Sequence, residues 1–175
     1  MSLRVGIDIG STTVKVVVLD EHNKLLFRSY ERHYSKTRER ACQTLRSISE
    51  MLAGQQIRVT ITGSAGLGVA NAAGIDFVQE VYATAAAVNT YIPGTDAVIE
   101  LGGEDAKIIY FEGGNIEQRM NGICAGGTGS FIDQMASLLQ TDATGLNEYA
   151  KNYKALYPIA ARCGVFAKTD IQPLI

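Results

Sequence analysis

The first 120 positions are dominated by short apolar runs that alternate with turn residues. Runs at Leu3–Ile9, Val14–Leu19 and Leu25–Arg32 have the length and content of strands. The first two are joined by Gly10–Thr13, and the second and third by a polar turn over Asp20–Lys24. Three strands with connections this short predict an antiparallel meander at the start of the chain.

Longer segments with helical spacing of apolar or small residues follow the meander and alternate with further strands. Helices are predicted at Thr37–Leu52, Phe77–Tyr91, Ser130–Leu139 and Leu146–Lys154, with Thr128 or Ser130 as the cap of the third. Further strands are predicted at Ile57–Thr62, Ala97–Leu101, Ala106–Phe111 and Asn115–Met120, and an extended segment at Ile159–Ala167. This alternation is typical of an α/β protein.

The chain contains an internal repeat with an offset of about 92 positions. At this offset Asp8 aligns with Glu100, Gly10 with Gly102, and Lys15 with Lys107. Both copies read as apolar strand, acid, glycine turn, lysine and apolar strand, followed by a turn and a third strand. We expect two related lobes, one over 1–92 and a second over 93–175.

Composition excludes several classes of protein. The 175 residues carry a net charge of −2, 46% are hydrophobic and 19% are charged, so general nucleic-acid binding is not expected. No apolar run is long enough to cross a bilayer, and the N-terminus lacks the pattern of a signal peptide. We expect a cytoplasmic protein. Three cysteines in a reducing compartment indicate metal binding or packing rather than disulfides.

The two glycine turns are candidates for phosphate binding. A tight turn with small side chains points consecutive backbone N–H groups outward, and such a nest binds anions. An ordinary hairpin connection explains either turn alone, but their matched register favours two nests that bind one polyphosphate. Neither turn is a P-loop or a dinucleotide-binding fingerprint. The residues expected to bind the nucleotide are Gly10, Ser11, Thr12, Thr13, Lys15, Gly102 and Gly103.

Acidic residues beside these turns are the candidate catalytic groups. Asp8 ends the first strand and is expected to hold Mg²⁺ through water. Glu104 and Asp105 follow the second turn, and all three carboxylates are predicted to act in hydrolysis. His22 and His33 have no paired carboxylate or cysteine spacing and are expected to face solvent.

Two cysteines have glycine-rich surroundings. Cys124 lies in Asn121–Ser130, just before a predicted helix, and Cys163 lies in Ala160–Asp170. Backbone N–H groups at such positions stabilise thiolates, which an iron–sulfur cluster needs. A cubane cluster takes four ligands, so two chains related by a two-fold axis predict a homodimer with one shared cluster. The alternative is a buried small apolar side chain, which is the interpretation kept for Cys42.

The phosphate turns carry a family resemblance. Val5–Lys15 and Ile99–Lys107 resemble the two phosphate motifs of the acetate kinase, sugar kinase, heat-shock protein and actin superfamily. That resemblance implies an actin-like ATPase fold, in which two ribonuclease-H-like lobes close on ATP or ADP and Mg²⁺. Many relatives have Asp where this chain has Glu100. The superfamily's adenosine-binding segment normally follows, and nothing after Cys163 matches it. We therefore expect an N-terminal fragment that binds ATP weakly.

Together with the two cysteine segments, these motifs resemble the activators of 2-hydroxyacyl-CoA dehydratases, in the BadF/BadG/BcrA/BcrD ATPase family. The resemblance implies a homodimer that holds one [4Fe-4S] cluster through Cys124 and Cys163 of each chain. It also implies that ATP hydrolysis drives a low-potential electron from this cluster to a CoA-thioester dehydratase or reductase. A ferredoxin or flavodoxin is the implied donor. The rival interpretations are a small-molecule kinase of the same fold, which needs no iron, and a nucleotide-responsive scaffold.

Overall fold

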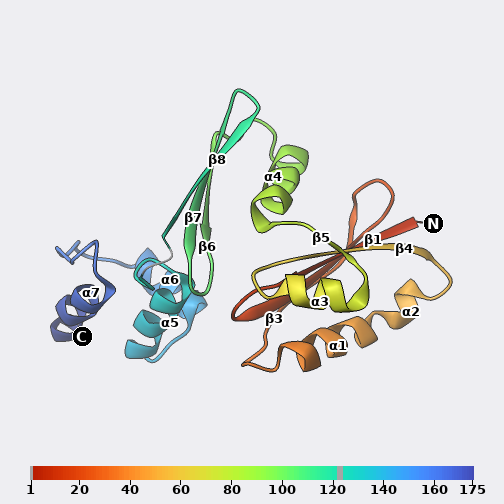
Figure 1. Cartoon of the computed structure of the whole chain (residues 1–175). Helices are drawn as coiled ribbons and strands as arrows, with labels where there is room; N and C mark the ends of the chain where they lie inside the picture. Colours follow the sequence, from red (N-terminus) through yellow and green to blue (C-terminus); the bar gives the residue numbers. More distant parts are fainter. Residues whose placement is uncertain (1, 122–123) are drawn as a thin grey trace. The chain divides into compact units, whose positions relative to one another are not determined.

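The computed structural model describes residues 2–121 and 124–175 of the chain (Figure 1). Internal contacts divide the chain into two compact units, Met1–Thr95 and Asp96–Ile175, called here the first and second units. Each unit has its own sheet and its own helices, and each is described separately below.

The first unit is built on a five-stranded mixed sheet with the order β3-β2-β1-β4-β5. The antiparallel pairs β1–β2 and β2–β3 form the predicted meander, and β4 and β5 add to it in parallel. The strands are β1 Ser2–Ile9, β2 Thr13–Leu19, β3 Leu25–Arg32, β4 Gln56–Thr62 and β5 Asp76–Phe77. The four longer strands were all predicted from their apolar runs, to within a residue at each end.

The helices of the first unit follow the prediction less closely. The predicted helix over 37–52 is interrupted at Ile48, and the predicted helix over 77–91 begins only at Glu80 because Phe77 belongs to β5. The helix after β4 was not predicted along its length, since its sequence is mostly glycine and alanine. The helices are α1 Thr37–Ser47, α2 Ser49–Leu52, α3 Gly66–Ala73 and α4 Glu80–Tyr91.

Strand alternation gives the central sheet two different faces. One face carries the apolar core, where side chains of β1 and β2 pack with Ile48, Ile61 and Ala70. Most of these side chains are almost fully buried, and Val14 is 0% exposed. The other face carries Asp8 and Lys15 and lies toward α4. The alternation therefore separates the structural core from the face that holds the candidate chemistry.

The second unit is a smaller arrangement around an antiparallel three-stranded sheet of order β6-β7-β8. Its core includes Ile109, Met135, Ala136 and Ala167, whereas every residue of β8 is exposed. The elements are β6 Ala97–Leu101, β7 Ala106–Glu112, β8 Asn115–Asn121, α5 Gly129–Leu138, α6 Ala143–Lys151, α7 Gly164–Ile171 and the 3₁₀ turn η1 Gln172–Leu174.

Three local expectations for the second unit need correction. The extended segment predicted over 159–167 is wrong in its second half, because α7 begins at Gly164. The helix predicted from Leu146 begins three residues earlier, since the Asp142 side chain accepts the Gly145 N–H and caps it. Thr128 is the N-cap residue of α5, but its hydroxyl donates to the Ala125 carbonyl and does not cap the helix.

The internal repeat is present in the strand register. Asp8 pairs with Lys15 across β1 and β2, and Glu100 pairs with Lys107 across β6 and β7. These positions are related by the same offset of 92 residues that relates the two sequences. Each unit therefore carries an acid and a lysine on neighbouring strands, directly before and after its glycine turn.

Candidate phosphate turns and cysteine site

The first glycine turn is a closed loop between β1 and β2. The Gly10 N–H donates to the Thr13 carbonyl at 2.9 Å, and this bond sets the width of the turn. Ser11 is exposed and Thr12 half-buried, whereas Thr13 is buried at the start of β2. The predicted phosphate residues of this turn thus present small side chains at the end of a hydrogen-bonded hairpin. That surface is the kind that binds anions.

Asp8 and Lys15 form an ion pair beside the turn. The Lys15 Nζ lies 2.7 Å from Asp8 Oδ2, and their side chains are 35% and 30% exposed. Lys15 also lies over the ring of Tyr30, with its nitrogen 5.3 Å from the centroid. The other carboxylate oxygen, Asp8 Oδ1, is buried and has no hydrogen-bond partner among the described residues. The pair is therefore half satisfied, because one acceptor still lacks a donor.

Thr62 joins this group from the neighbouring strand, and sequence reasoning did not single it out. It pairs with Asp8 across the parallel β1 and β4 strands, and its Oγ1 is also buried without a partner in the described part of the chain. The next residue, Gly63, has φ of 99°, and a Cβ there would overlap the Ile9 carbonyl and the Asp8 carboxylate. The sequence signal that could have pointed to Thr62 is the glycine that follows it at the end of a predicted strand. Ser64, which follows, lies two residues before the start of α3.

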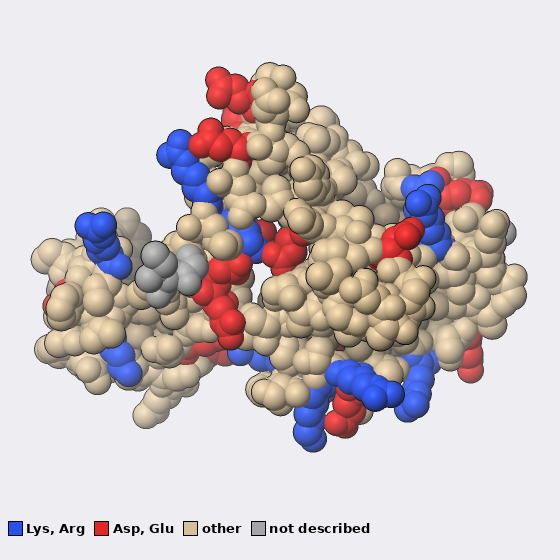
Figure 2. Space-filling view, viewed as in Figure 1, with Lys and Arg blue, Asp and Glu red and all other residues tan. Residues whose placement is uncertain are grey.

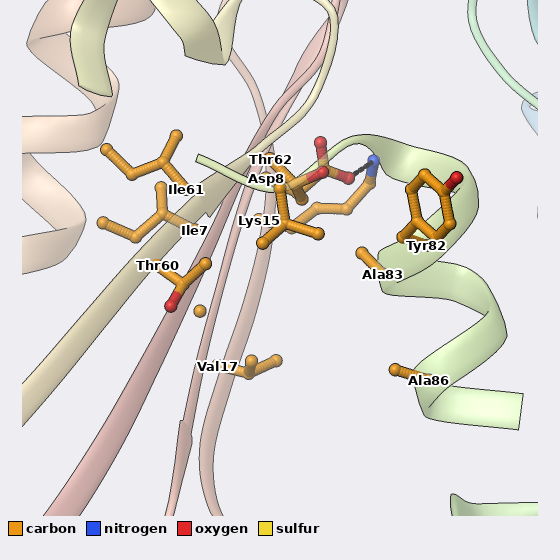
Figure 3. A pocket seen from close by; sticks show the side chains of 12 residues that line it. Ile7, Asp8, Lys15, Val17, Thr60, Ile61, Thr62, Tyr82, Ala83 and Ala86 are labelled. Carbon is orange, nitrogen blue, oxygen red and sulfur yellow. Dashed lines mark hydrogen bonds and ion pairs between the residues drawn. The ribbon is translucent and has the colours of Figure 1, made fainter. Parts of the chain in front are cut away.

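A cavity of about 470 Å³ lies beside these residues, entirely within the first unit. Its walls come from β1, β2, β4 and α4, and Figure 3 shows Asp8, Lys15 and Thr62 together at one end, where Tyr82 of α4 lies beside Lys15. The remaining wall is largely apolar and includes Ile7 and Ala86. Asp8 and Thr62, the two residues with an unpartnered oxygen, thus both line this cavity.

The second glycine turn differs from the first in the burial and the ion-pair partners of its lysine. Lys107 is only 6% exposed and lies 3.0 Å from Asp105 and 3.7 Å from Glu100. Glu104 is exposed at the tip of the turn. A Cβ at Gly102 would overlap the Asp105 carboxylate, so a side chain at that position would displace this acid. Lys107 is thus occupied in neutralising two acids, whereas Lys15 remains accessible.

The N-terminus of α5 is docked on the second turn. The Gly129 N–H donates to the Gly102 carbonyl at 2.7 Å, and the Ser130 N–H donates to the Gly103 carbonyl at 3.0 Å. The Ser130 hydroxyl also donates to the Gly103 carbonyl. Because these bonds join the turn to the first residues of α5, the position of the turn and the start of the helix are mechanically linked.

The loop that precedes α5 carries Cys124, and the N-cap of α7 is Cys163. The two segments touch, since a Cβ at Gly126 would lie 3.0 Å from the Gly164 nitrogen. The Gly126 N–H donates to Cys124 Sγ at 3.3 Å. This bond, followed by one from the Gly164 N–H, lowers the pKa of the Cys124 thiol below its ordinary value. Gly122 and Ile123 of the predicted motif lie outside the described residues.

Cys42 is separate from this arrangement. It lies on α1 of the first unit, where it is exposed. The expectation that it is a buried apolar side chain is therefore wrong, because it projects from a polar helix surface beside Arg38 and Arg46. Its chemistry is unrelated to the pair in the second unit.

A comparison with protein families identifies the chain. The model of the BadF/BadG/BcrA/BcrD ATPase family matches residues 5–173. The chain belongs to this family. It is 31% identical over 172 residues to the (R)-2-hydroxyglutaryl-CoA dehydratase activating ATPase of Acidaminococcus fermentans, covering 95% of this chain and 65% of that protein. The predicted family resemblance is therefore confirmed.

Solved structures of related activators confirm the fold of this member of the BadF/BadG/BcrA/BcrD family. Component A of the A. fermentans dehydratase superposes with a TM-score of 0.83 at 29% identity, covering 98% of this chain and 67% of that one. The activator of the 2-hydroxyisocaproyl-CoA dehydratase from Clostridium difficile, with bound ADPNP, gives 0.82 at 30% identity, with coverage of 97% and 64%. The chain thus has the expected α/β, actin-like ATPase fold and spans about two thirds of these relatives' lengths.

Three further observations bear on the ligands and surroundings of this family member. Among the described residues, no three His, Cys, Asp or Glu side chains gather into a group that can hold a metal. In residues 2–121 and 124–175, no helix has the length and apolarity needed to cross a membrane. On the face drawn in Figure 2, Lys and Arg of the described residues are interspersed with Asp and Glu. This mixed surface agrees with the small net charge.

The donor chemistry nevertheless fits the two implied inorganic groups. Asp8 Oδ1 is a buried, unpartnered oxygen, which suits a hydrated Mg²⁺ because this ion keeps several waters and takes few carboxylates. Cys124 has a lowered pKa and N–H donors at its sulfur, as a cluster ligand requires. One chain supplies two cysteines at this place, so a four-ligand cluster needs a second chain.

Proposed function

We propose that this chain is the nucleotide- and cluster-binding part of an ATP-dependent activator, which passes a low-potential electron to a 2-hydroxyacyl-CoA dehydratase or a related CoA-thioester reductase. The observation that carries the proposal is that α5 begins on the second turn, where Ser130 bonds to the Gly103 carbonyl, and that the loop of Cys124 leads directly into this helix. It joins a predicted phosphate turn to a predicted cluster ligand. Relatives named as dehydratase activators support the same role.

The nucleotide part of the proposal rests on the two glycine turns. We assign phosphate binding in the first unit to Gly10, Ser11, Thr12, Thr13 and Lys15. Lys15 is accessible and carries the positive charge that phosphate oxygens need. Asp8 would hold hydrated Mg²⁺ through its free oxygen, and the ion would neutralise charge that develops on the phosphates.

In the second unit we assign phosphate contacts to the backbone of Gly102 and Gly103. Glu104 is the exposed acid at this turn and is proposed to orient water or the hydrated ion. Asp105 is held by Lys107, so its proposed role is to keep the turn in shape and contribute its charge. Because α5 begins on these carbonyls, a change in the turn on nucleotide binding moves the N-terminus of the helix with it.

The cluster part of the proposal assigns Cys124 and Cys163 as ligands of a [4Fe-4S] cluster shared by two copies of the chain. The cluster supplies one-electron redox chemistry when bound. The protein's contribution is to favour the thiolate form of Cys124, because the Gly126 and Gly164 N–H groups lower the pKa of its thiol. A ferredoxin or flavodoxin is the proposed class of donor, since each delivers single electrons.

Anaerobic reconstitution tests the proposal directly. The 175-residue chain is mixed with iron and sulfide, and its iron content, mass in solution and EPR spectrum are measured. We expect about four irons per two chains. Cys124→Ser and Cys163→Ser should each abolish the bound iron, whereas Cys42→Ser, the matched control, should retain it. An iron-free protein that transfers phosphate from ATP to a small alcohol or carboxylate would support the kinase alternative instead.

A further inference from the structure

His33 is buried beside the first phosphate turn, although its sequence context predicted a solvent-facing side chain. It follows β3 directly and is only 6% exposed. Its Nδ1 accepts the Ser35 N–H at 3.1 Å, so in this arrangement the proton of the neutral ring is on Nε2. Nε2 lies 3.1 Å from the Gly10 carbonyl oxygen, to which it donates. The surroundings thus select one tautomer, with its N–H directed at the turn.

The main chain of His33 makes a second contact with the same turn. Its N–H donates to the Thr12 carbonyl at 3.1 Å. The Thr13 carbonyl accepts from the Gly10 N–H within the turn. Three carbonyl oxygens of the turn are therefore each held by a donor from the protein. Two of those donors belong to His33, which is 23 residues away from Gly10 in sequence.

Holding the carbonyl oxygens decides where the amides point. In a trans peptide the C=O and the following N–H point in opposite directions, and no described peptide bond is cis. When the Gly10 carbonyl is held by His33, the Ser11 N–H must point away from the ring. If the Gly10–Ser11 peptide flips, it presents a carbonyl oxygen to the phosphate and repels it. The His33 ring therefore favours the peptide orientation that an anion nest needs.

The backbone after His33 is strained in a way that preserves this contact. Tyr34 and Ser35 both have positive φ, at 46° and 63°, which is costly for residues other than glycine. The Tyr34 side chain is 75% exposed and gains little from burial. The same segment turns the Ser35 N–H back onto the ring and the Lys36 N–H onto the His33 carbonyl at 2.7 Å. Strain of this kind is typical of functional sites.

We propose that His33 is a positioning residue for nucleotide binding, which fixes the first turn with its amide groups directed at the phosphates. The proposal rests on the function proposed above, because it assumes that this turn binds phosphate. It names a residue outside the turn and outside the catalytic acids. It also assigns separate tasks to the ring nitrogens, since Nε2 orients the turn and Nδ1 fixes the ring.

Two substitutions separate these tasks. His33→Gln places an amide N–H near the position of Nε2, so it keeps a donor to the Gly10 carbonyl and loses the acceptor for Ser35. His33→Asn places an acceptor near the position of Nδ1 and loses the donor to the turn. Binding of Mg²⁺–ADPNP is followed by NMR titration of the amide resonances, including Ser11. His33→Gln should bind within about threefold of the wild type, and His33→Asn about tenfold more weakly.

The two variants also test whether His33 has only a structural role. If it does, affinity falls in step with thermal stability, and His33→Gln loses as much affinity as His33→Asn; that result overturns the proposal. A ring ¹⁵N spectrum that shows a proton on Nδ1 at neutral pH also overturns it. If the wild type does not respond to Mg²⁺–ADPNP, the proposed function fails. Amide exchange at Ser11 then decides the positioning role: faster exchange in His33→Asn alone supports it, and equal exchange in all three proteins overturns it.

Discussion

Asp8 and Thr62 face each other across the parallel β1–β4 pair, and each has one buried side-chain oxygen without a partner among the described residues. Such groups cost free energy in the folded protein, typically about 1–3 kcal/mol each. Both residues line the same cavity, and Lys15 pairs with Asp8 from β2, on the other side of β1. The unpartnered oxygens of Asp8 and Thr62 thus lower the stability of the folded protein. They do so beside Lys15, where a phosphate-bound, hydrated ion is proposed to bind.

Thr62→Val should raise stability and weaken magnesium-dependent nucleotide binding. Valine keeps the shape of threonine and removes the unpartnered hydroxyl, so the free energy of unfolding should increase by about 1 kcal/mol. The same change removes a hydrogen bond to the hydrated ion. Thermal unfolding and NMR titration with ADPNP, each with and without Mg²⁺, measure the two effects. Thr60→Val, on the same strand face but away from Asp8, is the control. A variant that gains stability and retains full magnesium dependence would contradict the role assigned to Thr62.

Lys15→Met should weaken ADPNP binding by about ten- to a hundredfold, as expected for losing one charge-assisted contact of roughly 1.5–3 kcal/mol. Methionine keeps most of the side-chain volume and the contact with Tyr30, so the loss reports mainly on the charge. Lys24→Met removes the same charge from an exposed turn and should leave affinity unchanged. Equal effects of the two substitutions would show that only long-range charge matters, because a direct contact has no counterpart at Lys24.

The sequence was sufficient to predict both meanders, because short turns between consecutive apolar runs leave neighbouring strands little choice but to pair antiparallel. The offset that aligns Asp8 with Glu100 and Lys15 with Lys107 in the sequence also relates the pairs Asp8–Lys15 and Glu100–Lys107 in the two sheets. His33 and Thr62 were missed for a physical reason: their roles depend on contacts with residues far away in sequence. His33 reaches a turn 23 positions earlier, and Thr62 meets Asp8 only through a parallel strand pair.

Intrinsic helix propensity also failed to predict helix starts that are determined by tertiary contacts. The helix at Gly164–Ile171 begins with glycine, which disfavours helix on intrinsic grounds. The close approach of Gly126 explains why that position is glycine, since a side chain there would meet the backbone of the cysteine loop. Similarly, Gly129 opens α5 because its N–H and its missing side chain allow the helix to dock on Gly102. These glycines reflect packing that a single segment cannot reveal.

Gly129→Ala should therefore destabilise the protein, whereas Gly68→Ala should stabilise it. A Cβ at Gly129 would lie 3.0 Å from the Gly102 carbonyl oxygen, and this backbone contact can relax only by moving the turn or the helix. We expect a loss of about 1–3 kcal/mol. Gly68 on α3 has open space where the alanine methyl group would lie, so alanine should gain about 0.5–1 kcal/mol there. Denaturant unfolding of both variants provides the measurement, and equal effects would argue against docking.

Cys124 should react as a thiolate at lower pH than an ordinary cysteine. The Gly126 N–H, and then the Gly164 N–H, lower the pKa of its thiol, so the ionised form is populated at pH values where a free thiol is still protonated. The rate of alkylation by iodoacetamide, followed at the Cys124 peptide by mass spectrometry in iron-free protein, should reach half its maximum at a lower pH than for N-acetylcysteine. Since only the thiolate attacks, the direction of this shift reports the N–H donation directly. A half-maximum at or above that of the free thiol would show that these donors do not stabilise the thiolate, and the proposed role of Cys124 as a cluster ligand would lose this support.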